Sequence, residues 1–442
     1  MPLPGASPLR QAWPNERHAY TCRMKIYLVG GAVRDSLLGL PVVDRDWVVV
    51  GATPEQMTAQ GFLPVGKDFP VFLHLRTHEE YALARTERKT APGYRGFVIH
   101  ADPQVTLEQD LARRDLTINS IAAYACCSDV SGTFDIEKVL DPLAEGNLID
   151  PFGGQQDLTA KLLRHVTEAF REDPVRILRV ARFAARFSDF SVAPETMQLM
   201  RDMVTSGEVD HLVSERVWGE ISKGLMAGKP SRMFDVLTEC GGFERLFSGL
   251  MWGPEAASIL DLGARLDAPL PVRFSCLAVA CTPPAAAKEL GSDPNLLPPA
   301  LTRVPAPCRD LAAATVREAG HIHTAAALDA QALVTLLTRC DAFRKPDRFA
   351  DLLLACECLW RGRLGMQESA YPARAHLLAV LRMAQSVATN SVAGSAHSAG
   401  VTGQKVGEMI QAARVEAVAH GLDKINTKST GRLAQQTRAS AP

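Results

Sequence analysis

Two short stretches near the start of the chain decide its fold: Leu28-Val29-Gly30-Gly31-Ala32-Val33-Arg34-Asp35 and Asp44-Arg45-Asp46-Trp47-Val48-Val49-Val50. The first leads from a strand-like segment, 26–29, through two glycines into a helix-like segment, 32–38. Glycine has no Cβ and lets backbone approach a phosphate closely, and the free N–H groups at a helix start favour anions. The second opens an apolar strand. Side chains two apart on a strand share a face, so Asp44 and Asp46 are predicted to hold divalent cations together.

Each of these features also has an ordinary alternative. A Gly-Gly pair is usually a turn, an Asp-x-Asp pair is more often solvated or salt-bridged, and Arg34 could be a surface arginine. The order strand, Gly-Gly, helix, Asp-x-Asp strand is far more restrictive than either half alone. We therefore predict that Gly31 and Arg34 contact the phosphates of a nucleotide. Asp44 and Asp46 are predicted to be catalytic residues that bind Mg²⁺.

The composition of the 442-residue chain limits its class. Its 47% hydrophobic content allows about two to four domains with proper cores. The net charge of −1 gives no global nucleic-acid signature, so any RNA contact must come from local basic patches. The ten cysteines lack metal-binding spacing and indicate reduced thiols in a cytoplasmic protein. No apolar run is long enough to span a membrane, and none forms a signal peptide.

Further motifs follow the first two stretches. They are residues 65–74, residues 77–89, Arg113-Arg114-Asp115-Leu116-Thr117-Ile118-Asn119, and Glu172-Asp173-Pro174-Val175-Arg176-Ile177-Leu178-Arg179-Val180-Ala181-Arg182-Phe183. With them, residues 24 to about 245 resemble the tRNA nucleotidyltransferases, or CCA-adding enzymes, of the DNA polymerase beta superfamily. The resemblance is strongest to bacterial class II enzymes of the multidomain proteobacterial branch. It implies Mg²⁺-dependent addition and repair of the 3′-terminal CCA of tRNA from CTP and ATP, by two-metal transfer without a nucleic-acid template.

The resemblance implies roles for individual residues. Arg114 and Asp115 would recognise the ribose and phosphates, although arginines at a helix C-terminus also suit the helix dipole. Asp173 offers only acceptors and Arg176 only donors, so the pair could present a Watson–Crick-like edge to a base. In the family such a pair selects CTP and then ATP. The ordinary alternative is a surface salt bridge between residues three apart.

A helix over residues 173–187 would carry this pair. Its apolar face contrasts with a row of arginines on the other side. Arg179 and Arg182 in that row complete the nucleotide-binding set that the resemblance implies.

The pattern of short strands followed by long helical stretches predicts an α+β nucleotidyltransferase head and an all-α remainder. The expected domains are a disordered extension (1–23), the head (24–163), a helical neck that binds nucleotide and RNA (164–245), a helical body (246–385) and a largely flexible tail (386–442) with one helix over 403–420. Residues 126–146 are predicted to form an inserted loop or hairpin.

The body departs from its expected relatives. Those relatives carry an HD domain with a metal-binding His-Asp pair, and residues 271–284, where it should lie, contain neither residue type. We expect a degenerate HD-like body without phosphohydrolase activity. Two alternatives to CCA addition stay open: a bacterial poly(A) polymerase and an inactive RNA-binding relative. The sequence leaves the oligomeric state unknown.

Overall fold

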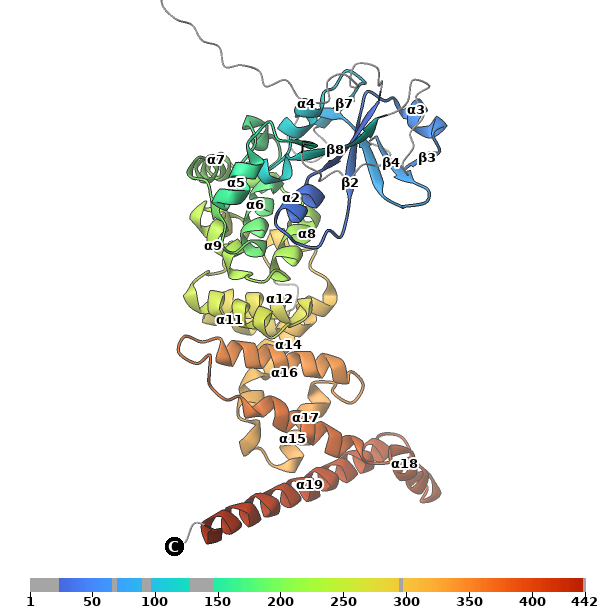
Figure 1. Cartoon of the computed structure of the whole chain (residues 1–442). Helices are drawn as coiled ribbons and strands as arrows, with labels where there is room; N and C mark the ends of the chain where they lie inside the picture. Colours follow the sequence, from blue (N-terminus) through green and yellow to red (C-terminus); the bar gives the residue numbers. More distant parts are fainter. Residues whose placement is uncertain (1–23, 66–69, 90–96, 128–145, 294–296, 440–442) are drawn as a thin grey trace, which may run out of the picture. The chain divides into compact units, whose positions relative to one another are not determined.

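The computed structural model describes residues 24–65, 70–89, 97–127, 146–293 and 297–439 (Figure 1). The chain divides into two compact units, one of residues 1–213 with 239–242 and one of residues 214–238 with 243–442. The extension predicted over 1–23 and most of the insertion predicted over 126–146 lie outside the described residues.

A seven-stranded mixed sheet is the centre of the first unit. Its strands are β1 (Lys25–Val29), β2 (Asp46–Val50), β3 (Phe62–Pro64), β4 (Val71–His74), β5 (Glu80–Leu83), β8 (Ala122–Cys127) and β9 (Leu148–Ile149). They follow the order β3-β4-β5-β2-β1-β8-β9, and all neighbours are antiparallel except β2 and β5. β1 is buried at four of its five positions, as its apolar sequence dictates. Strands predicted from residues 26–29 and 47–50 are confirmed.

Short helices and two small sheets complete the first unit. The helices are α2 (Gly31–Leu37), α3 (Pro54–Ala59), α4 (Leu107–Ala112), α5 (Gly154–Ala160), α6 (Val175–Arg186) and α7 (Pro194–Thr205), with 3-10 turns η1 (Thr117–Asn119), η3 (Glu168–Glu172) and η4 (Glu208–His211). The small sheets pair β6 (Arg85–Lys89) with β7 (Phe97–Ala101) and β10 (Leu162–Leu163) with β11 (Ser191–Val192).

Local sequence explains several of these helices. Thr53 with Gln56, and Thr106 with Gln109, form capping boxes that satisfy free N–H groups at the starts of α3 and α4. In α6 the predicted apolar face, represented by Ile177, is fully buried. Burial of each large apolar side chain contributes about 1.5–3 kcal/mol, so packing rather than propensity holds α6 in place.

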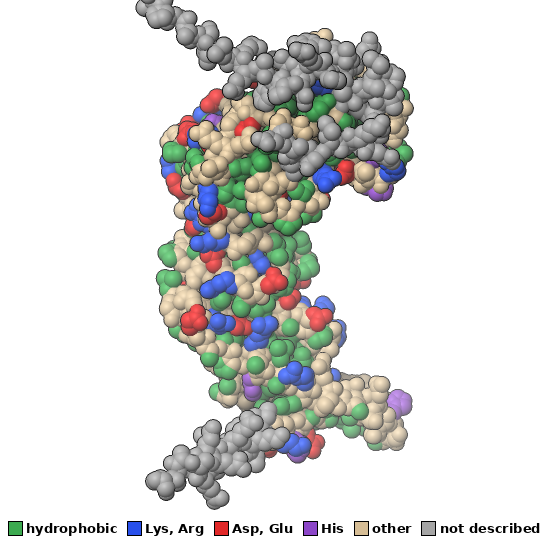
Figure 2. All heavy atoms as spheres, viewed as in Figure 1, with side chains coloured by type: hydrophobic (Ala, Val, Ile, Leu, Met, Phe, Trp, Pro, Cys, Tyr) green, Lys and Arg blue, Asp and Glu red, His purple; other side chains and the backbone are tan. Residues whose placement is uncertain are grey.

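The second unit is helical in every described element. These are α8 (Ser214–Leu225), α9 (Ser231–Glu239), α10 (Gly242–Leu246), α11 (Pro254–Arg265), α12 (Leu270–Cys281), α13 (Pro284–Ser292), η5 (Pro299–Leu301), α14 (Ala306–His323), η6 (Ala325–Ala327), α15 (Ala330–Arg339), α16 (Pro346–Arg361), α17 (Pro372–Gln385), α18 (Thr389–Ser398) and α19 (Gln404–Ala439). Basic and acidic side chains of this unit are interspersed on the face drawn in Figure 2.

The α+β head followed by an all-helical remainder confirms the predicted fold class. The helix predicted over 403–420 is too short, because α19 continues to Ala439. Residues beyond 420 contain no proline before Pro442 and include alanine, leucine, glutamine, lysine and arginine, which favour helix. No single helix among the described residues is long and apolar enough to cross a membrane; the bent pair α12 and α13 meets that test by length and composition only.

Candidate active site in the first unit

The acidic pair, Asp44 and Asp46, lies at the start of β2. Asp46 is the first residue of the strand, opposite Val29 of β1 and beside Glu80 of β5. The prediction that both carboxylates lie on the strand is wrong for Asp44, which precedes it. β1 ends at Val29, so no antiparallel partner remains for residues before Asp46.

Both members of the acidic pair are exposed and line an open cleft of about 730 Å³. Crowding by protein atoms raises the pKa of Asp46, and the nearby charge of Asp44 raises it further while Arg114 opposes the shift. Glu79, on the same cleft, accepts a hydrogen bond at 3.0 Å from the indole Nε1 of Trp47. The cleft thus gathers carboxylate oxygens with few protein donors to neutralise them.

This donor set fits a divalent cation such as Mg²⁺. No group of three or more His, Cys, Asp or Glu side chains among the described residues is arranged to hold a metal alone. Mg²⁺ is commonly bound through one or two carboxylates, with waters and substrate phosphates as its other ligands. An exposed acidic pair on an open cleft meets that requirement.

The glycine pair joins β1 to α2. Gly30 has a φ of +69°, which side-chain-bearing residues rarely adopt, and a Cβ built there would meet Nη1 of Arg114 at 3.0 Å. Gly31 is the first residue of α2 and has an ordinary φ. Glycine at position 30 is therefore favoured by the backbone conformation, and a side chain there would also displace the end of the Arg114 side chain.

Arg34 is buried, with 2% of its surface exposed. Its Nε donates to Oδ1 of Asp35 at 2.9 Å, and its Nη1 donates to Oδ1 of Asn119. Its guanidinium lies over the rings of Phe183 and Phe187, at 5.1 and 5.2 Å from their centroids. Burial lowers the pKa of Arg34, and the Asp35 carboxylate opposes that shift.

Asp35 connects two helices of the first unit. Its Oδ1 pairs with Arg34 of its own helix α2, and its Oδ2 accepts from Nη2 of Arg186 in α6 at 2.8 Å. Because an arginine buried without a counter-charge is costly, this carboxylate is needed to keep Arg34 beneath the glycine pair.

The residues from Arg113 to Asp115 follow α4 and are held by carboxylates and amides. Asp110, fully buried, accepts from Nη2 of Arg113 at 2.7 Å and from Nη2 of Arg114 at 3.2 Å. Asp115 accepts from Nε of Arg179 at 2.7 Å. Burial alone would raise the pKa of Asp115, but Arg179, the Asn119 amide and the Leu116 N–H together lower it to about 2.

Asp173 and Arg176 lie at the start of α6. Asp173 has extended backbone and its carboxylate caps the N–H of Val175, so the helix begins two residues later than predicted. The cause is Pro174, since a residue before proline avoids the helical region. Arg176 is 8% exposed and donates to the carbonyls of Ala169 (2.9 Å) and Arg113 (2.6 Å). It thereby ties α6 to the residues after α4.

Hydrogen bonds and ion pairs join six residues into one arginine network: Arg34, Asp35, Asp115, Asn119, Arg179 and Arg186. Three of these residues were not predicted as site residues: Asp35, Asn119 and Arg186. Asp35 directly follows Arg34 and Asn119 ends the motif 113–119, and this closeness to predicted site residues was the signal available in the sequence. Arg182 is outside the network, with its guanidinium 4.3 Å from the ring centroid of Phe183.

The region of the missing His-Asp pair lies in α12 of the second unit. α12 packs against α11, α14 and α16, and Phe274, Cys276 and Cys281 are fully buried. α12 also buries Arg273, which donates to the carbonyls of Ala268 and Leu225, and Ser275, which donates to the hydroxyl of Thr315, but neither is a His or an Asp. The absence of phosphohydrolase activity stays a prediction.

Comparisons with known proteins assign the class of the head first. Residues 26–164 match the family model described as the poly A polymerase head domain. Residues 189–257 match the family model described as a probable RNA and SrmB-binding site of polymerase A. A structure of a CCA-adding enzyme with ATP is similar in fold, with 21% identity, a TM-score of 0.60, and coverage of 89% of this chain and 86% of that one.

Full-length relatives define the family. The chain is 58% identical over 421 residues to the multifunctional CCA protein of Polaromonas naphthalenivorans, covering 89% of this chain and 98% of that protein. It is 57% identical over 434 residues to the protein of the same name from Verminephrobacter eiseniae, covering 90% and 99%. The chain belongs to the family of multifunctional CCA proteins.

Proposed function

We infer that this chain is a nucleotidyltransferase that adds and repairs the 3′-terminal CCA of tRNA, using CTP and ATP as substrates. The observation that carries the inference is the 58% identity that extends along 98% of a multifunctional CCA protein. The acidic pair, open to solvent beside the glycine pair, supplies a site suited to that chemistry.

In this proposal Asp44 and Asp46 hold Mg²⁺ and are the catalytic residues. Bound divalent cations would neutralise phosphate charge and make the RNA 3′-hydroxyl easier to deprotonate, as in two-metal transfer. The two carboxylates contribute by their position and by staying ionised. Crowding by protein atoms raises the pKa of Asp46 in the metal-free protein and a bound cation would lower it, so protons and Mg²⁺ compete for this carboxylate.

The nucleotide-binding set keeps its predicted members: Gly31, Arg34, Arg114, Asp115, Asp173, Arg176, Arg179 and Arg182. Arg34 and Asp115 are buried and already paired, so we assign them the task of fixing the surfaces that meet the nucleotide. Arg114 approaches Gly30 and acts electrostatically on Asp46, which suits a residue between the phosphates and the acidic pair. Asp173 and Arg176 are proposed to read the base.

The predicted domains also remain a proposal: head 24–163, neck 164–245, body 246–385 and tail 386–442. We further place the enzyme in the cytoplasm, because its proposed substrates are tRNA, CTP and ATP.

The deciding experiment uses the pure full chain and tRNA that lacks its CCA end. Reactions contain CTP alone, ATP alone or both, and the products are resolved at single-nucleotide length. We expect two CMP residues with CTP and a further AMP only when both nucleotides are present. A run of AMP from ATP alone would instead assign poly(A) synthesis, and no extension would assign an inactive RNA-binding relative. The Asp44→Asn variant controls for contaminating activity.

A further inference from the structure

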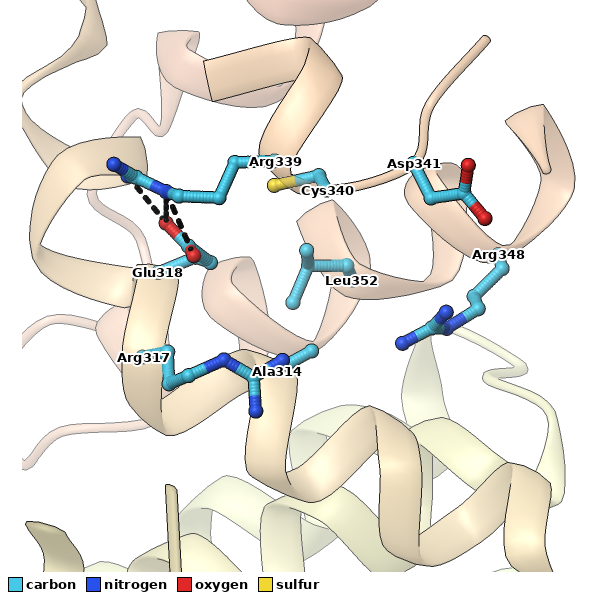
Figure 3. Close-up of a pocket in the computed structure, with 8 residues that line it drawn as sticks. All are labelled: Ala314, Arg317, Glu318, Arg339, Cys340, Asp341, Arg348 and Leu352. Carbon is cyan, nitrogen blue, oxygen red and sulfur yellow. Dashed lines mark hydrogen bonds and ion pairs between the residues drawn. The ribbon is translucent and has the colours of Figure 1, made fainter. Parts of the chain in front are cut away.

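A small pocket in the second unit lies where α14, α15 and α16 come together (Figure 3). Its volume is about 40 Å³. Three arginines line it, Arg317, Arg339 and Arg348, together with the carboxylates of Glu318 and Asp341. The pocket belongs to the helical body and is unrelated to the acidic pair of the head.

Both carboxylates already form ion pairs with arginines other than Arg317 and Arg348. Glu318 is almost fully buried and accepts from Nε of Arg339 at 2.9 Å and from its Nη2 at 2.5 Å. Asp341 accepts from Nε of Arg344 at 2.6 Å and from its Nη2 at 3.1 Å, and Arg344 does not line the pocket. The negative charges of the pocket are therefore largely balanced without Arg317 and Arg348.

The guanidinium ends of Arg317 and Arg348 point toward one another from opposite sides of the pocket (Figure 3). Arg317 donates from Nη1 to the carbonyl of Gly291 at 2.9 Å, a neutral acceptor that leaves its charge uncompensated. Arg348 has neither a hydrogen bond nor an ion pair within 4 Å among the residues that the structure describes, although Asp341 is near enough to interact with its charge. Like charges facing each other across a void favour an anion between them.

We propose that this pocket binds one phosphate group, held between Arg317 and Arg348. A water molecule needs roughly 10–15 Å³ of such volume, so the pocket of about 40 Å³ has room for about three oxygen-sized groups, and the fourth oxygen of a phosphate would lie at its mouth; a base or a sugar does not fit. Guanidinium forks match the oxygens of a phosphate in geometry and charge. Burial raises the pKa of the Cys340 thiol to about 12, so the sulfur at the pocket wall stays neutral and does not repel the anion.

The test is calorimetric titration of the full chain with inorganic phosphate, in buffer without divalent cations. The variants are Arg317→Gln, Arg348→Gln and Asp341→Asn. The matched control is Arg303→Gln, an exposed arginine of the same unit that pairs with Glu215 outside the pocket. Thermal unfolding of each variant shows whether its fold is retained.

Phosphate should bind the wild-type chain, and each pocket Arg→Gln variant should bind it about tenfold more weakly, as expected for loss of a charge-assisted hydrogen bond. Asp341→Asn, which removes a negative charge and keeps a side chain tolerated at its φ of +58°, should bind more tightly. Arg303→Gln should bind like wild type. No phosphate binding, or equal binding by all five proteins, would overturn the proposal.

The same variants distinguish two sources of the phosphate group. If the pocket holds a backbone phosphate of bound tRNA, Arg348→Gln weakens tRNA binding and lowers the salt dependence of its affinity by about one counterion. If it holds free phosphate, tRNA affinity is unchanged while inorganic phosphate binding is lost.

Discussion

The acidic pair and the arginine network are both made of charged residues in the first unit, but their surroundings differ. Asp44 and Asp46 are exposed on a cleft. Arg34, Asp35, Asp115 and Asn119 are buried, and each hydrogen-bonds to another member of the network. Crowding by protein atoms and, more weakly, the charge of Asp44 raise the pKa of Asp46, whereas pairing with Arg179 and hydrogen bonds from Asn119 and Leu116 lower the pKa of Asp115 to about 2. The difference supports our proposal that the acidic pair meets the substrate and that the arginine network maintains the shape of the site.

The largest effect is expected at the acidic pair. Asp44→Ala or Asp46→Ala should lower CMP and AMP incorporation at least about a thousandfold, because we propose that both bind the metal ions that act on the chemical step. Both side chains are exposed, so the free energy of unfolding should change by less than about 0.5 kcal/mol. Single-turnover rates and thermal unfolding measure the two quantities. Incorporation within about tenfold of wild type would remove the assignment.

At Asp35 we expect a large loss of stability, in contrast to the small change in stability expected at the acidic pair. Asp35→Ala leaves Arg34 buried without its counter-charge, which should cost about 3–5 kcal/mol of folding free energy. Asp35→Glu, which keeps the charge, should recover part of that loss. The measurements are chemical denaturation and hydrogen exchange of α2 and α6. Equal stability of Asp35→Ala and wild type would show that the network does not join these helices.

A third effect separates base selection from phosphate binding. Asp173→Ala should lower the ratio of correct to wrong nucleotide incorporation by about tenfold or more, because a lost edge contact leaves polar groups unpaired. The apparent affinity for the triphosphate should change much less. Competition between CTP and UTP measures the ratio, and Asp202→Ala, at an exposed position of α7, is the matched control. An unchanged ratio would leave Asp173 with only its capping role at Val175.

The last expected effect is on the pH dependence of folding stability. The pKa of Asp115 falls from an ordinary 3.8 to about 2 on folding. Its ionised form therefore adds stability that is fully present above about pH 5 and is lost as the pH falls toward 2, a contribution of about 2 kcal/mol. Asp115→Asn should make stability less dependent on pH in this acid range. Denaturation midpoints between about pH 5 and 3 measure it, and parallel curves for the two proteins would contradict the assignment.

The sequence predicted those elements of the first unit that depend only on residues adjacent along the chain. The strands at 26–29 and 47–50 follow from short apolar runs rich in β-branched residues. The position of Asp44 outside β2 could not be predicted in this way, because it depends on where the partner strand β1 ends. The later start of α6 could have been read from Pro174.

The arginine network was harder to predict, because its members are far apart along the chain. Asp35 and Arg186 are separated by 151 residues, and only the packing of α6 brings them together. Arg34 was predicted as a phosphate ligand from its place after the glycines, and its burial could not be read from that spacing. Local spacing thus identified the exposed residues, while buried partners required the fold.

In the proposed function, the acidic pair binds the divalent cation that nucleotidyl transfer needs. The most direct measurement is the Mg²⁺ dependence of CMP incorporation into tRNA lacking its CCA end, in wild type and Asp46→Asn. We predict no incorporation after chelation, recovery on adding Mg²⁺, and a half-saturating Mg²⁺ concentration about tenfold higher or more in Asp46→Asn. Incorporation that persists without divalent cations, or the same Mg²⁺ dependence in both proteins, would contradict the claim.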